Sequence, residues 1–283
     1  MSKKLYIIAT PIGNINEISK LAISTLNNCN YFFCEDTRNS KKLFNLLDIS
    51  IDKKFFYSLN SINERKVIEN FDFNKNEYCL LSDAGYPILS DPGFLLINHF
   101  ITNKWEIQVV NGPCSMIHAL VVSGFPINNS LFYGFLDHNK NNKLAELQIL
   151  KKEEKTIVIF ESVHRVKETL KMIQSIFDNN KNICIGRELT KINETIYREK
   201  ISNINLLNIV EKGEFTIVIN NNVCKDKTNK FSKNDDYFQY LNELKLLISK
   251  GEKEKIACKM IAYKYNLKSN FLYNFWQEQK NCI

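Results

Sequence analysis

The chain has 283 residues, enough for two domains of ordinary size that each have their own hydrophobic core. With 44% hydrophobic residues and no apolar run near the ~20 residues that cross a bilayer, the composition excludes a helical membrane protein. The net charge of +7 favours a polyanionic partner without requiring one, because the basic residues are spread along the chain. The apolar stretch at residues 5–9 is too short for a signal peptide and runs into Pro11 and Gly13, so we expect a cytoplasmic protein with no membrane partner.

The first part of the chain repeats one pattern, in which a short apolar strand leads through polar, Gly or Pro residues into a helical stretch. The expected strands are residues 5–9, 31–34, 78–81 and 106–110. The expected helices lie near residues 18–26, after a cap at Thr37 or Ser40, near 94–100, and up to residue 122. This alternation predicts an α/β fold with a mainly parallel sheet covered on both faces. The loops at the carboxyl ends of such strands converge on one crevice.

A second unit follows the Gly124-Phe-Pro126 segment, which is typical of a hinge. Its expected strands are residues 131–136, 156–160 and 182–185, with 215–219 as the last, and a Lys-rich helical stretch spans 142–154. We therefore expect an N-terminal α/β domain (1–118), a C-terminal α/β domain (119–222), a polar linker (223–234) and a helical module (235–283). The lysines of this module predict either a solvated face or a helix-turn-helix-like surface that contacts RNA.

Residues 82–94 stand out because the chain has only 9 Gly and 5 Pro, and this stretch holds two of each. Gly reaches backbone conformations closed to other residues, and Pro fixes φ. Since an apolar strand precedes the stretch, the pattern predicts either a ligand-binding loop or an ordinary tight turn into a helix.

Several kinds of site are excluded by missing motifs. No Gly-x-Gly-x-x-Gly follows the first strand, and neither a phosphate-binding Gly-x-x-x-x-Gly-Lys-Ser/Thr loop nor a Gly-x-Ser-x-Gly nucleophile elbow is present. The eight Cys form no Cys-x-x-Cys pair and the four His lack ligand spacing, so we expect no metal site and no disulfide framework.

Carboxylates and arginines gather in four loops near strand ends. These loops carry Glu35, Asp36 and Arg38; Asp83 and Asp91; Glu161 and Arg165; Arg187 and Glu188. Only five of the 38 basic residues are Arg, whose planar fork suits carboxylate or phosphate, and three of the five lie in these loops. The pattern predicts a shared polar site, with internal salt bridges as the alternative role of each Arg.

The loops carry an ordered set of motifs. They are Ala9-Thr-Pro-Ile-Gly-Asn14, Glu35-Asp-Thr-Arg38, Ser82-Asp-Ala-Gly85, Ser90-Asp-Pro-Gly93, Gly112-Pro-Cys114, Glu161-Ser with His164-Arg165, and Arg187-Glu-Leu-Thr-Lys191. The set resembles the bacterial small-subunit rRNA (cytidine-2′-O)-methyltransferases of the tetrapyrrole methylase superfamily, from about residue 5 to 220. Porphyrin and corrin methylases usually carry Gly-Asp-Pro where this chain has Gly85-Tyr86-Pro87.

This resemblance implies two α/β domains with S-adenosylmethionine (AdoMet) in the cleft between them, a small C-terminal helical module, and a homodimer. By the same analogy, the cofactor contacts are Ile12, Tyr86, Leu89, Cys114, Ser115, Phe160, Gly186 and Phe215. Two residues depart from the usual pattern of the group: Tyr86 replaces a small residue, and Asn111 stands where Pro is frequent.

The implied reaction is methyl transfer from AdoMet to a ribose 2′-oxygen of a cytidine in the decoding region of small-subunit rRNA. Asp36, Asp83 and Glu161 are candidate bases, which the sequence does not rank. Arg38, Arg165, Arg187 and Lys191 suit contacts with the RNA backbone. Two alternatives stay open: a tetrapyrrole or protein methyltransferase of the same fold, and a non-catalytic RNA-binding assembly protein.

Overall fold

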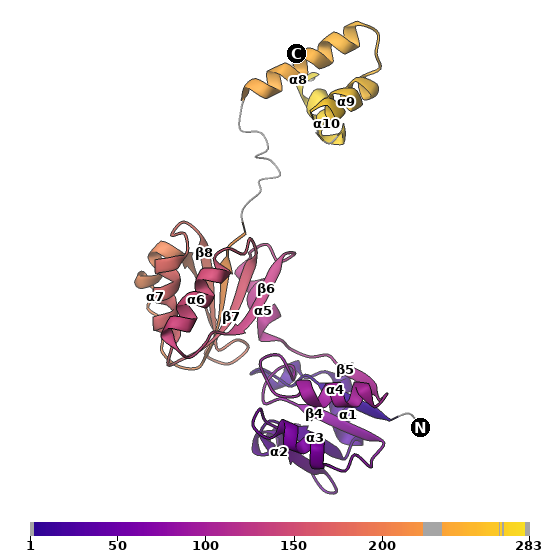
Figure 1. Ribbon diagram of the computed structural model, residues 1–283, viewed down its shortest axis with the longest axis vertical. Helices are drawn as coiled ribbons and strands as arrows, with labels where there is room; N and C mark the ends of the chain where they lie inside the picture. Colours follow the sequence, from indigo (N-terminus) through magenta and orange to yellow (C-terminus); the bar gives the residue numbers. More distant parts are fainter. Residues whose placement is uncertain (1–2, 223–233, 266, 268, 281–283) are drawn as a thin grey trace. The chain divides into compact units, whose positions relative to one another are not determined.

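A computed structural model describes residues 3–222, 234–265, 267 and 269–280. The chain divides into two compact units, Met1–Val223 and Cys224–Ile283, and both β-sheets belong to the first (Figure 1). No helix among these described residues is long and apolar enough to cross a membrane. Of the expected linker, residues 223–233 lie outside the described part of the chain.

The first sheet is entirely parallel, as expected. Its strands are β1 (Lys4–Ile8), β2 (Tyr31–Cys34), β3 (Phe55–Ser58), β4 (Glu77–Leu81) and β5 (Glu106–Val110), in the order β3-β2-β4-β1-β5. Helices cover both faces: α1 (Lys20–Asn28), α2 (Thr37–Leu46), α3 (Glu64–Asn70) and α4 (Phe94–Thr102). One apolar cluster includes Leu26 of α1 and Phe44 of α2, and a second includes Leu96 and Phe100 of α4. We call this sheet with its helices the first lobe.

The cap of α2 differs from the expectation at Thr37 or Ser40. Asp36 is the N-cap, and its Oδ1 accepts a hydrogen bond from the Arg38 backbone N at 2.8 Å. Thr37 is the first helical residue and Ser40 is buried, because the helix begins directly at the end of the loop after β2. A carboxylate at this position satisfies a free backbone N–H and favours the positive end of the helix dipole.

The second sheet is mixed. Its strands are β6 (Ser130–Phe135), β7 (Thr156–Ser162), β8 (Asn182–Arg187), β9 (Thr195–Lys200) and β10 (Glu214–Asn220), in the order β6-β7-β10-β8-β9. Only β6 and β7 are parallel; β10 runs antiparallel to both β7 and β8, and β9 is antiparallel to β8. The last strand, β10, lies at the centre of the sheet. Its residues 215–219 are all buried, which is typical of a strand covered on both faces.

Helices also cover both faces of the second sheet. On one face, α5 (Ser115–Ser123) packs Ala119 and Leu120 against Val158, Cys184 and Val218. On the other, α6 (Lys140–Leu150) and α7 (Val166–Ile176) lie side by side (Figure 1). We call β6–β10 with α5–α7 the second lobe.

Two strands and two α-helices of the first unit were not expected from the sequence: β3, β9, α3 and α7. Strands β3 and β9 each lie at one edge of their sheet, and neither has a buried residue. A half-exposed edge strand lacks the continuous apolar run that marks a buried one.

The described residues of the second unit are helical, as their pattern indicated, and form α8 (Asn234–Ser249), α9 (Glu254–Lys264) and α10 (Ser269–Lys280). It has its own apolar core, made of Tyr240, Leu244, Ala257, Cys258, Ile261, Ala262, Leu272 and Trp276. The unit therefore does not need the sheets to bury its apolar side chains.

Candidate active site between the two lobes

The carboxyl ends of four neighbouring parallel strands bring the polar loops of the first lobe together. Because β2, β4, β1 and β5 are adjacent, the segments after Cys34, Leu81, Ile8 and Val110 leave the same edge of the sheet. Thr10 and Gly85 exchange two backbone hydrogen bonds of 2.9 and 3.1 Å, which join the loop after β1 to the loop after β4. This is the edge at which open α/β sheets bind ligands.

The second lobe supplies the facing wall. Phe215, near the start of β10, lies opposite Glu161 of β7 on one side and Arg187 of β8 on the other. The two lobes also touch directly, since the backbone N of Asn14 donates to Thr190 Oγ1 at 3.1 Å.

A cavity of about 390 Å³ lies between these loops, with walls from both lobes. Its volume is within the roughly 300–1,000 Å³ typical of small-molecule sites. The predicted cofactor contacts that line it are Ile12, Tyr86, Leu89, Cys114, Ser115, Phe160 and Phe215. Gly186 does not: the side chain of Leu189 covers it, so closely that a Cβ on Gly186 would lie 2.8 Å from Leu189 Cδ2, and Leu189 lines the cavity instead.

Two further hollows adjoin the cavity. One, of about 880 Å³, shares Ile12, Tyr86, Leu89 and Cys114 with it. The other, of about 290 Å³, shares Ile12, Asp83, Ala84 and Glu214, and its other lining residues include Asn39, Lys42 and Lys191. We call this smaller hollow, which has lysines in its wall, the polar hollow.

The two residues that depart from the group pattern contact each other. Tyr86 Oη lies 3.2 Å from Asn111 Oδ1, to which it donates, and accepts a hydrogen bond of 3.2 Å from the Gly112 backbone N. The pair therefore joins the loop after β4 to the loop after β5 at the rim of the cavity.

The backbone of the Gly- and Pro-rich loop is held in unusual conformations. Ile88 and Ser90 have φ values of 74° and 75°, and for a β-branched residue such as Ile this region is strongly disfavoured. Gly93 has a φ of 126°, and a Cβ there would lie 2.7 Å from Leu80 Cδ2. Such conformations cost roughly 1–3 kcal/mol each and gather at functional sites.

Two of the three candidate bases have carboxylates engaged near the start of α2. Asp83, which lines the cavity, accepts hydrogen bonds from the Asp36 backbone N (3.2 Å) and from Asn39 Nδ2 (2.7 Å). Asp36 does not line the cavity, and it forms an ion pair of 2.6 Å with Arg38. Hydrogen bonds from the Arg38 side chain lower the pKa of Asp36 to about 2, which makes it a weak base.

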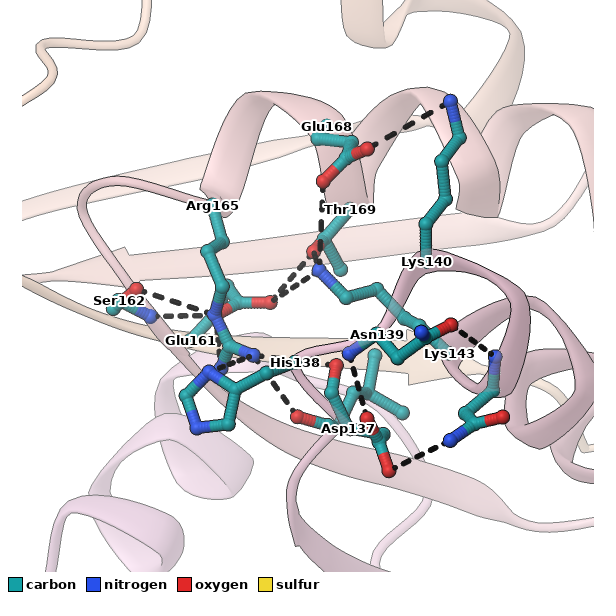
Figure 2. Close-up of polar contacts among 12 residues, drawn as sticks. Asp137, His138, Asn139, Lys140, Lys143, Glu161, Ser162, Arg165, Glu168 and Thr169 are labelled. Atoms are coloured by element: carbon teal, nitrogen blue, oxygen red, sulfur yellow. Dashed lines mark hydrogen bonds and ion pairs between the residues drawn. The ribbon is translucent and has the colours of Figure 1, made fainter.

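Glu161, the third candidate, belongs to a buried ionic network (Figure 2). Its side chain is fully buried, with one oxygen 2.8 Å from Arg165 Nη2 and the other accepting from Thr169 Oγ1 at 2.6 Å. Lys143 is also fully buried, and its Nζ lies 3.9 Å from Glu161 and 3.7 Å from Glu168. Glu161 borders the cavity, yet both its oxygens are held by side chains of its own lobe.

The four predicted RNA-contacting cations differ in exposure. Arg165 donates to the carbonyl oxygens of Leu136 and Asp137, and Arg187, 6% exposed, donates to those of Lys212 and Asn193. Lys191 pairs with Glu188 and Glu214 at 2.9 and 3.0 Å. The side chain of Arg38 is 84% exposed, so its guanidinium faces solvent beside its partner Asp36.

Sequence reasoning placed Glu35 and Asp91 in the shared polar site without giving either a role, and it did not name Glu214 or Lys143. Glu35, Asp91 and Glu214 line the cavity, and Lys143 Nζ lies 3.9 Å from the buried Glu161 carboxylate behind it. Burial, together with the Glu35 and Asp83 carboxylates, raises the pKa of Asp91 to about 7. The Ser90-Asp-Pro-Gly93 motif contains Asp91. No motif marks Lys143, because it lies in a Lys-rich helical stretch that is typical of a solvent-exposed helix.

The family model for tetrapyrrole (corrin/porphyrin) methylases matches residues 4–205, which includes both lobes up to the turn after β9. The chain belongs to the tetrapyrrole methylase family. Two solved methylases have the same fold: uroporphyrin-III-C-methyltransferase from Thermus thermophilus (13% identity, TM-score 0.54) and the methyltransferase CobJ (10%, 0.56). Each alignment covers 77% of this chain and 94% of the other.

The curated relatives of this chain include proteins named ribosomal RNA small subunit methyltransferase I. The one from Mycoplasma genitalium is 42% identical over 98% of this chain and 99% of its own length. The Haemophilus influenzae protein is 31% identical over 96% and 95%. The Thermotoga maritima protein is 37% identical over 97% of its own length but only 76% of this chain.

Proposed function

We propose that this methylase transfers a methyl group from AdoMet to the 2′-oxygen of a cytidine in the decoding region of 16S rRNA, acting as a cytoplasmic homodimer. The observation that carries the proposal is the cavity between the lobes, because the loops of the rRNA methyltransferase pattern converge on it. The relatives' names supply the class of substrate.

The lining of the cavity fits AdoMet. Phe160, Phe215 and Leu89 offer apolar surface for an adenine ring, and Glu35 offers negative charge for the cationic parts of the donor. When bound, AdoMet supplies an electrophilic methyl carbon. The protein's part is to orient the acceptor oxygen toward that carbon, and alignment of this kind can supply roughly 7–11 kcal/mol of the barrier.

For the RNA we propose a path along the start of α2 and the polar hollow. Arg38 is exposed there, and Asn39 and Lys42 lie in the wall of the hollow, so the region can hold ribose and phosphate groups. Lys191 lines the same hollow from the second lobe. Arg165 and Arg187, which bind backbone carbonyls, are proposed to position loops for this contact.

The test measures donor binding and methyl transfer separately. We expect the wild-type protein to bind AdoMet in calorimetry and to methylate small ribosomal subunits from a strain that lacks the gene, with the modified ribose mapped by sequencing. Arg38→Ala should keep its AdoMet affinity within about twofold. It should lose about 10–100-fold in kcat/KM for the subunits, the value of a charge-assisted hydrogen bond of ~1.5–3 kcal/mol.

Arg65→Ala is the matched control, because Arg65 is an exposed arginine of α3 that lines neither the cavity nor the polar hollow. It should behave as wild type in both assays. Transfer to a porphyrin precursor or a protein but not to subunits would contradict the proposed substrate. Absence of AdoMet binding would favour a non-catalytic RNA-binding protein, and lost AdoMet binding in Arg38→Ala would contradict the role of Arg38.

A further inference from the structure

The acidic residues of the cavity differ in how far their oxygens are already engaged. The Asp83 carboxylate accepts two hydrogen bonds, and both Glu161 oxygens are bound by side chains of the second lobe. Glu214 pairs with Lys191, and Glu35 Oε2 accepts a hydrogen bond of 3.3 Å from the Asp83 backbone N. Asp91 has a side-chain hydrogen bond with Ser82 and no ion pair with any described residue. Among the cavity acids that the structure describes, Glu35 and Asp91 are therefore the two that have neither an ion pair nor hydrogen bonds to both oxygens, and of these Asp91 belongs to the Gly- and Pro-rich loop after β4.

The backbone on both sides of Asp91 has restricted conformations. Ser90 precedes it in a left-handed conformation, and Pro92 and then Gly93, at a φ of 126°, follow it. Gly93 is packed against Leu80 of β4, where a Cβ would not fit. A strained segment persists only where the surrounding structure holds it, and here it fixes the position from which one carboxylate borders the cavity.

The charges that face Asp91 are predominantly negative. Glu35 approaches from the end of β2, Asp83 from the same loop, and Glu214 from the start of β10 with Lys191 as its partner. Burial and these neighbours place the pKa of Asp91 at about 7. A base is most effective when its pKa lies near the working pH, because it is then both deprotonated and a good proton acceptor.

We propose that Asp91 is the general base of the reaction and accepts the proton of the ribose 2′-hydroxyl; this inference rests on the proposed function. The 2′-oxygen forms its bond to the methyl carbon, the electron pair of the broken carbon–sulfur bond stays on sulfur, and the proton passes to the Asp91 carboxylate. Asp91 returns that proton to solvent after the products leave.

The first test is Asp91→Asn, which keeps the size of the side chain and removes the base. Methyl transfer to small ribosomal subunits should fall by about 10²–10⁴-fold. The wild-type kcat/KM for AdoMet, which reports the enzyme before the donor binds, should fall tenfold per pH unit below about pH 7 and level off above it, since the carboxylate is the active form. The residual activity of Asp91→Asn should lack this inflection. Asp52→Asn, at an exposed turn outside the cavity, is the matched control and should behave as wild type.

The second test changes a neighbour of Asp91. Glu35→Gln removes a negative charge that raises the pKa of Asp91, so the inflection of the pH profile should move to lower pH.

The third test uses calorimetry without the RNA substrate. AdoMet binding at pH 7 should release protons from the wild-type protein, because the positive donor favours the Asp91 carboxylate, and Asp91→Asn should bind AdoMet without this release.

The outcomes separate the two proposals. A wild-type protein that neither binds AdoMet nor methylates subunits refutes the proposed function, and the role of Asp91 falls with it. If the wild type is active, an Asp91→Asn variant whose transfer rate is within threefold of wild type, or whose pH profile keeps the inflection, refutes only the role of Asp91 as the base. If the folded Asp91→Asn variant does not bind AdoMet, Asp91 is a ligand of the donor, and its role as the base is likewise refuted.

Discussion

At the scale of single residues, the second lobe shows how a candidate catalytic acid can instead have a structural role. Glu161 lies between Lys143 and Arg165 with its side chain fully buried (Figure 2). Removing one member of a buried ionic network leaves its partners uncompensated, which is far more costly than losing an exposed pair. Arg165 extends the network to the carbonyl oxygens of Leu136 and Asp137.

We predict that Glu161→Gln lowers the free energy of unfolding by about 3–5 kcal/mol, measured by urea denaturation, because Lys143 and Arg165 lose their shared counter-charge. Glu168→Gln is the matched control. Glu168 contacts the same Lys143 from a half-exposed position, so its loss should cost no more than about 1 kcal/mol. Equal stabilities of the two variants would contradict a structural role for Glu161.

At the scale of elements, the segment between β4 and α4 combines two functions in one loop. It starts α4 at Gly93 and lines the cavity through Tyr86, Leu89 and Asp91. Its left-handed residues turn the chain back toward the first loop, where Gly85 bonds to Thr10. The sparing use of Gly and Pro elsewhere in the chain is consistent with a loop whose backbone shape matters.

We predict that Gly93→Ala lowers the free energy of unfolding by about 2–5 kcal/mol, since it adds a contact with Leu80 to the cost of a left-handed conformation. Gly124→Ala isolates the conformational part. Gly124 also has a positive φ, but a Cβ there has open space, so this change should cost about 1–2 kcal/mol. A Gly93→Ala variant as stable as Gly124→Ala would contradict the packing argument.

At the scale of the whole molecule, the sheets and the helical unit have separate cores. The apolar clusters of Met1–Val223 contain no described residue of the helical unit. The helical unit adds lysines, among them Lys255 and Lys259, which are exposed on α9. Its loss should therefore affect RNA affinity more than the donor site.

We predict that a chain truncated after Asn222 folds and binds AdoMet within about twofold of wild type, measured by circular dichroism and calorimetry. Its KM for small ribosomal subunits should rise, because phosphate contacts from the lysines of the helical unit are gone. A truncated chain that does not fold would show that the first unit depends on the second, and an unchanged KM would exclude a role of the helices in RNA binding.

The sequence by itself determined the fold class, most strands and the family, because a buried strand followed by a polar turn is a local pattern and the ordered motifs are specific as a set. It also indicated which loops meet, since the carboxyl ends of parallel strands share one edge of a sheet. The cofactor and RNA contacts inferred from the resemblance remain predictions for the experiments above.

Only the tertiary structure decided which acids are available and which are engaged. Lys143 belongs to α6 and Glu161 to β7, the next element along the chain, so their pairing depends on how the helix packs on the sheet and is not a local sequence pattern. The pKa of Asp91 likewise depends on burial and on Glu35, a residue of another strand end. Electrostatics depends on distances in space and on exclusion of water, and both are set by packing between segments far apart in the chain.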